Sequence, residues 1–79
     1  MAKDDAEEAI KDLSQTIALD PDHAKAYYYR GQVYALLGRH DQALADYEQT
    51  IALDPTRTKA AEKRDALREA AISWYVPGP

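Results

Sequence analysis

The sequence predicts an all-α protein of antiparallel helix-turn-helix repeats, with four helices in one small domain. The segment QTIALDP occurs at residues 15–21 and again at 49–55, a spacing of 34 residues. Between residues 6–26 and 40–60, 11 of 21 aligned positions are identical. A fixed period of this length indicates stacked repeats, because each repeat is a supersecondary unit that cannot bury its apolar face alone. Apolar residues recur at helical spacing, and no run of β-branched residues predicts a strand.

The first helix is expected over residues 6–19. Asp5 followed three positions later by Glu8 is a capping-box arrangement at its start. The apolar positions at spacings of three and four are Ala6, Ala9, Ile10, Leu13 and Ile17. The helix should end before Pro21, because the residue before a proline is pushed out of the α region.

The second helix is expected over residues 24–37, with Asp22 as its N-cap. Its predicted buried stripe is Tyr27, Arg30 with Gly31, Tyr34 and Leu37. A glycine inside a helix costs about 1 kcal/mol relative to alanine, so Gly31 predicts close approach of a partner helix. Gly38 supplies the left-handed conformation that ends the helix.

The third and fourth helices are expected over residues 41–53 and 58–72. The third begins near Asp41, ends at Pro55 and carries Ala43, Leu44, Tyr47, Ile51 and Leu53. Thr56 is the predicted cap of the fourth, which carries Ala60, Ala61, Leu67, Ala70 and Ala71. Connections this short make consecutive helices antiparallel neighbours.

Composition excludes several classes of protein. The chain has 79 residues, no cysteine and a net charge of −4, so it has no disulfide or thiolate metal site, and nucleic acid is not an expected partner. No apolar run approaches the roughly 18 residues of a membrane span. The polar, acidic N-terminus does not resemble a signal peptide, which favours a cytoplasmic protein. Residues 1–23 hold seven acids and two bases (−5), whereas residues 57–79 hold five bases and three acids (+2).

A motif in the middle of the chain resembles the tetratricopeptide repeat, usually written W-x2-L-G-x2-Y…A-x3-F…P over 34 residues. The matching residues are Tyr27, Arg30, Gly31, Tyr34, Ala43, Tyr47 and Pro55. Tyr27 and Tyr47 replace the tryptophan and the phenylalanine and keep a large ring. Arg30 replaces the leucine, and we expect its stem to pack while its charged head reaches outward.

The resemblance implies a domain organisation. Residues 1–5 would be an N-terminal tail, 6–73 a single repeat domain and 74–79 an aromatic, proline-rich tail. Within the domain, residues 6–21 resemble the second helix of a preceding repeat and 24–57 a full repeat. Residues 58–72 resemble a capping helix or the first helix of a following repeat, with Arg64 and Asp65 where the motif has leucine and glycine.

No residue pattern predicts catalysis, a cofactor or a metal site. Ser14 and Ser73 have no histidine nearby in sequence, and the chain has no glycine-rich phosphate loop. The acids and histidine of residues 20–23 are better explained as a helix stop, a turn and an N-cap than as metal ligands. We therefore expect a protein that is not an enzyme.

The candidate binding residues lie on the first helix of the full repeat and on the last helix. Opposite the predicted buried stripe, the second helix carries Lys25, Tyr28, Tyr29, Gln32 and Leu36, and tyrosine is enriched at interfaces. The resemblance implies that first helices line a concave groove for an extended peptide or a partner helix. The candidate contacts are Lys25, Tyr28, Tyr29, Gln32, Lys59 and Lys63. The resemblance also implies a candidate ligand, because some family members clamp the terminal carboxylate of a peptide with lysine and asparagine side chains. Lys59 and Lys63 suit such a clamp. Tyr28, Tyr29 and Gln32 do not supply its lysine–asparagine pair.

Two functions remain open from the sequence. One is a protein-interaction module that binds a peptide or helix through this groove. The other is a self-assembly unit, a homo-oligomer that stacks or exchanges its incomplete terminal helices, helped by the apolar tail Trp74-Tyr75-Val76 and by the opposite charges of the two ends.

Overall fold

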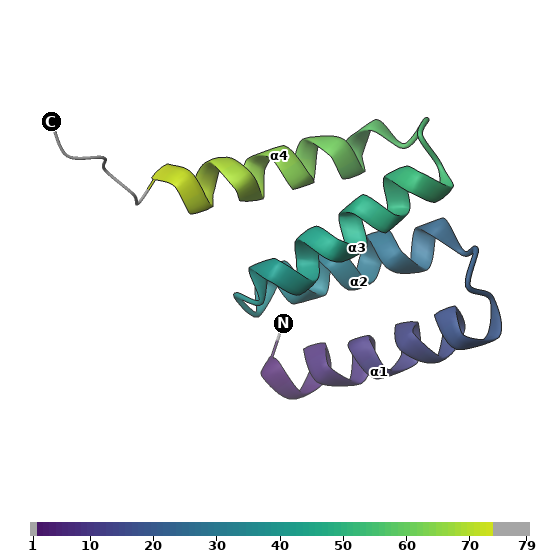
Figure 1. Ribbon diagram of the computed structural model, residues 1–79. Coiled ribbons are helices and arrows are strands. Elements are labelled where there is room, and N and C mark those ends of the chain that lie inside the picture. The colour runs from purple at the N-terminus through teal and green to yellow at the C-terminus, as the bar shows by residue number, and fades with distance from the viewer. Residues whose placement is uncertain (1, 74–79) are drawn as a thin grey trace, which may run out of the picture.

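The computed structural model describes residues 2–73, which form four helices (Figure 1). They are α1 (Lys3–Leu19), α2 (Ala24–Leu36), α3 (His40–Leu53) and α4 (Thr58–Ser73). Each helix packs against the next one along the chain. The described residues contain no strand. The predicted all-α class with four helices is confirmed; the Trp74-Tyr75-Val76 tail lies outside the described residues.

The repeated segment QTIALDP builds the same helix stop twice. Asp20 ends α1 with φ −141° and ψ 86°, and Asp54 ends α3 with φ −142° and ψ 85°. Each backbone N–H donates to a threonine carbonyl four residues earlier at 2.8 Å. Each carboxylate accepts from the backbone N–H two residues later at 3.2 Å, on the far side of the proline. The predicted ends of both helices are therefore right.

The predicted capping box at Asp5 is wrong. Helix α1 begins at Lys3, and its N-cap, Ala2, makes no side-chain hydrogen bond. The first turn closes from the Ala6 N–H to the Ala2 carbonyl at 3.0 Å. Asp4 and Asp5 lie inside this first turn, where carboxylates stabilise a helix through its macrodipole instead of capping it.

The caps expected from Asp22 and Thr56 are also wrong. The N-cap of α2 is His23, whose Nδ1 accepts from the Ala26 N–H at 3.1 Å. The Thr56 hydroxyl donates to the Asp54 carboxylate, so it is directed back into the turn. Helix α3 begins at His40, one residue before the expected Asp41.

The core lies between α2, α3 and α4 and centres on Tyr47, which is 1% exposed. Around it lie the buried Tyr28, Ala43 and Ala60, and the Tyr28 ring is tilted against the Tyr47 ring at a centroid distance of 6.0 Å. The expected exposure of Tyr28 is thus wrong, since it is only 6% exposed. Helix α2 packs against both α1 and α3. A single buried stripe therefore describes it poorly; Tyr27, Tyr34 and Leu37 of that predicted stripe are only half-buried.

Both glycine predictions are confirmed. A β-carbon on Gly31 would lie 2.8 Å from Cε1 of the Tyr47 ring, so α2 and α3 approach closely at this point. Gly38 has a φ of +76° at the end of α2, a left-handed conformation that favours glycine.

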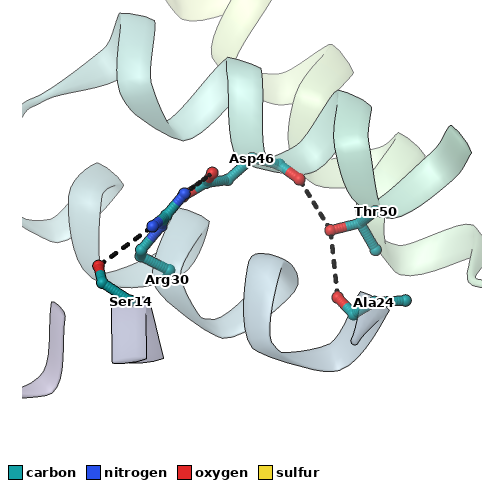
Figure 2. A network of polar contacts seen from close by, with 5 residues as sticks. All are labelled: Ser14, Ala24, Arg30, Asp46 and Thr50. Atoms are coloured by element: carbon teal, nitrogen blue, oxygen red, sulfur yellow. Dashed lines mark hydrogen bonds and ion pairs between the residues drawn. The ribbon is translucent and has the colours of Figure 1, made fainter. Parts of the chain in front are cut away.

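Arg30 joins three helices instead of reaching into solvent (Figure 2). Its Nε and Nη2 donate to the two carboxylate oxygens of Asp46 on α3, both at 2.8 Å, and its Nη1 donates to Ser14 on α1 at 3.1 Å. Asp46 is 4% exposed. The outward position expected for the Arg30 head is therefore wrong, because the buried carboxylate of Asp46 offers a planar, bidentate partner that draws it inward. The hydrogen bond to Asp46 raises the pKa of Arg30 further above its usual range.

Thr50 completes the polar contacts between α2 and α3 (Figure 2). Its side chain is fully buried, and its hydroxyl lies 2.8 Å from the Asp46 carbonyl and 3.5 Å from the Ala24 carbonyl at the start of α2. Asp46 and Thr50 are thus buried polar residues of α3 that the apolar pattern did not predict.

Candidate binding groove

A groove of about 460 Å³ opens between α2 and α4. Its walls come from the C-terminal half of α2 and the middle of α4, and Tyr47 of α3 contributes from the core. The lining residues are Gln32, Ala35, Leu36, Tyr47, Lys63, Ala66 and Leu67. Leu36 is 71% exposed, so it adds water-accessible apolar surface to the groove. The groove therefore combines apolar walls with one amide and one cation.

The structure brings two of the six candidate residues together in this groove. Gln32 of α2 and Lys63 of α4 both line it. Gln32 Nε2 donates to the Tyr28 hydroxyl at 3.3 Å, so Tyr28 orients the amide while its own ring belongs to the core. Binding by any of these residues stays a prediction.

The other candidates lie outside the groove lining. Lys25 and Tyr29 lie near the start of α2, where the Lys25 ammonium is 5.7 Å from the centre of the Tyr29 ring. Tyr29 is 41% exposed, and Lys59 is exposed in the first turn of α4. Lys25 and Tyr29 thus form a basic, aromatic pair in the first half of α2.

The sequence did not single out Arg57, which lies in the turn before α4. Its guanidinium carbon is 5.6 Å from the centre of the Tyr28 ring, a cation–π distance. Its Nε is buried with no hydrogen-bond partner among the described residues, 3.8 Å from an Asp54 carboxylate oxygen. Arg57 thus adds a positive charge beside the ring that orients Gln32.

The other missed residues are the small and apolar ones of the lining, Ala35 and Ala66 above all. The 34-residue period carries a signal that could have found Ala66, because it stands at the position that Gln32 occupies one repeat earlier. Residues at the same repeat position on successive first helices lie on the same side of the stack.

The titratable groups among the groove-lining residues are the Tyr47 phenol and the Lys63 ammonium. Burial raises the pKa of Tyr47 to about 12, helped by the nearby Tyr28 and Asp46, so its phenol is neutral at physiological pH. Among residues 2–73 no cluster of histidine, aspartate and glutamate could hold a metal ion. No helix in the described part of the chain is long and apolar enough to cross a membrane. Apolar walls beside an ammonium and an amide suit a ligand with an apolar side chain and a carboxylate or carbonyl oxygen.

Two family models match the chain. The model described as "Tetratricopeptide repeat" matches residues 24–57, which contain α2 and α3. A second model, described as "TPR repeat", matches residues 1–38, which contain α1 and α2. The two matches overlap on α2 and together extend over residues 1–57. No curated protein matches the chain.

Proposed function

Since residues 1–57 of this chain belong to the tetratricopeptide repeat family, we propose that it is a non-enzymatic protein-interaction module that binds a peptide segment or partner helix through the α2–α4 groove. Repeats of this family generally mediate protein–protein interaction. The groove lies between two helices that occupy equivalent positions one repeat apart, so a ligand would contact the first helices of the stack.

The observation that carries this proposal is the exposure of Leu36 beside the apolar groove walls. Fully burying a leucine side chain contributes about 1.5–3 kcal/mol relative to leaving it in water. A ligand with an apolar side chain would cover Leu36, Ala35 and Leu67 together. Leu36 therefore supplies the apolar part of the binding free energy.

The polar residues in and near the groove suggest the chemistry of the ligand. Lys63 and Gln32 lie in the groove itself, and Arg57 and Lys59 add positive charge toward the start of α4. A carboxylate or a peptide carbonyl would accept hydrogen bonds from the Lys63 ammonium and the Gln32 amide. We therefore propose a short peptide segment that carries an apolar side chain next to an acidic group.

The experiment selects peptides from a random library on the full chain and measures their dissociation constants with purified variants. Leu36→Asp should weaken binding at least tenfold, because it places a charge against the apolar ligand. Leu19→Asp is the matched control, since Leu19 on α1 is 89% exposed and lies outside the groove. Both variants should keep the melting temperature. Equal affinity of Leu36→Asp and wild type, or failure to select any peptide, would refute the proposal.

The alternative function, self-assembly, would use other surfaces. It requires faces of α1 and α4 that lie away from the groove, so a single chain has room for both activities. Peptide binding and self-association can then be measured separately on the same variants.

A further inference from the structure

Helix α1 carries an uncovered copy of the α3 surface that packs on α2. Residues 34 positions apart correspond, so Ala9, Asp12, Leu13 and Thr16 stand for Ala43, Asp46, Tyr47 and Thr50. The four α3 residues are buried, with exposed fractions of 0–4%. In α1, Asp12 is exposed and the other three are only half-buried. The Thr16 hydroxyl even repeats the Thr50 contact, lying 3.2 Å from the Asp12 carbonyl.

Helix α4 carries the matching arginine. Arg64 stands 34 residues after Arg30, which holds the buried carboxylate of Asp46 with two hydrogen bonds of 2.8 Å. Arg64 Nε instead donates to its neighbour Asp65 at 3.2 Å; the Arg64 side chain is 26% exposed and the Asp65 side chain 59%. One end of the chain thus presents the carboxylate of this contact, and the other presents the guanidinium.

We propose that α1 of one copy of this chain packs on α4 of a second copy in the register in which α3 packs on α2, with Asp12 pairing with Arg64 across the contact. The contact joins a segment of charge −5 (residues 1–23) to one of charge +2 (residues 57–79). Charge complementarity of this kind favours the correct orientation and speeds association. Because the two surfaces differ, the contact is heterologous, and copies add head to tail.

Two residues at the centre of the contact differ from their counterparts in the α2–α3 contact. In the α2–α3 contact, Gly31 faces Tyr47, where a β-carbon would lie 2.8 Å from ring atom Cε1. In the contact between copies, Asp65 takes the place of Gly31 and Leu13 takes the place of Tyr47. Leucine ends at its δ-carbons and has no ε ring atom, so the shortest of the Gly31 contacts has no counterpart in the contact between copies. Arg64 then lies between two carboxylates, Asp65 and Asp12 of the neighbour.

The test is the molar mass of the full chain by light scattering from about 10 µM to 1 mM at low salt, where exposed charges are least screened. The mass of the wild type should rise with concentration. Asp12→Arg alone and Arg64→Asp alone should each weaken association at least tenfold, because each places like charges across the contact. An equimolar mixture of the two variants should restore association, since the arginine introduced in one variant then faces the aspartate introduced in the other.

The matched control for Asp12→Arg is Glu8→Arg, with each variant measured alone. Glu8 and its counterpart Gln42 are both exposed, so this change gives the same net charge on a face outside the contact. Glu8→Arg alone keeps Asp12 and Arg64, so it should associate as the wild type does, whereas Asp12→Arg alone should associate at least tenfold more weakly. A wild-type mass of one chain at every concentration, equal weakening by Glu8→Arg and Asp12→Arg, or no restoration in the mixture of Asp12→Arg with Arg64→Asp, would overturn the proposal. Circular dichroism of each variant checks that these surface changes leave the helices folded.

Discussion

A β-carbon at Gly31 would lie 2.8 Å from Cε1 and 3.0 Å from Cδ1 of the Tyr47 ring. The backbone of α2 therefore rests directly on the largest buried side chain of α3. Side-chain size at this point sets how closely the two helices of the full repeat can approach.

Gly31→Ala should destabilise the protein by about 1–3 kcal/mol, the usual cost of overpacking a core. The sign of this change in stability is informative. In a helix without this contact, alanine would be the more stable residue by about 1 kcal/mol. Urea unfolding of Gly31→Ala, Tyr47→Leu and the double variant measures the coupling. The double variant should be more stable than the sum of the two single changes in unfolding free energy predicts. Strict additivity would mean that the size of the Tyr47 ring does not restrict the residue at position 31.

Arg30→Ala should lower the free energy of unfolding by about 3–5 kcal/mol, because it leaves the buried carboxylate of Asp46 without its partner. Replacing both residues, as in Arg30→Leu with Asp46→Leu, should cost much less, since no buried charge then remains unpaired. Thermal and urea unfolding of the three proteins provides the comparison. A double variant as unstable as Arg30→Ala would show that the pair contributes packing and not charge compensation.

His23→Ala should destabilise the protein by about 0.5–2 kcal/mol, the usual effect of losing an N-cap. His23→Asn keeps a side-chain acceptor and should retain most of the stability. Asp22→Ala is the matched control, and its effect on the melting temperature should be smaller because Asp22 is exposed and is not the cap. A larger loss of stability from Asp22→Ala than from His23→Ala would show that Asp22 is the N-cap of α2.

Stability should fall as the pH rises from about 10 to about 12, and Tyr47 should be one cause. Its pKa in the folded protein is about 12, raised chiefly by burial, while an unfolded tyrosine ionises near pH 10. Between these values the folded state binds more protons than the unfolded state, so each rise in pH favours unfolding. Tyr47→Phe removes this contribution, and its unfolding free energy should decline less steeply over the same range. Parallel curves for the two proteins would contradict the assignment to Tyr47.

The sequence predicted where two helices end and where glycine is needed, features that depend on local chemistry. The Asp-Pro segments end two helices, Gly38 adopts a positive φ, and Gly31 marks a close contact, because each residue type has few structural alternatives. The 34-residue period also predicted which helices are equivalent.

Apart from the helix caps predicted at Asp5, Asp22 and Thr56, the errors concern features that depend on neighbours in space. The apolar spacing predicts an exposed stripe for Tyr28 because it describes one buried helix face, whereas α2 packs against both α1 and α3. The outward position predicted for Arg30 is wrong because its carboxylate partner, Asp46, lies 16 residues away on α3, and the local sequence does not reveal that contact. The groove lining was found only in part, since Leu67 was assigned to the core and Ala66 carries no chemical signal of its own.

The proposal that the α2–α4 groove binds a peptide is tested most directly by amide chemical shifts in ¹⁵N NMR spectra of the full chain, recorded while a library-selected peptide is added. The largest changes should fall on Gln32, Leu36, Lys63 and Leu67, with little change at Leu19 on α1. Binding that shifts the amides of α1 and leaves those of the groove unchanged would contradict the proposed site.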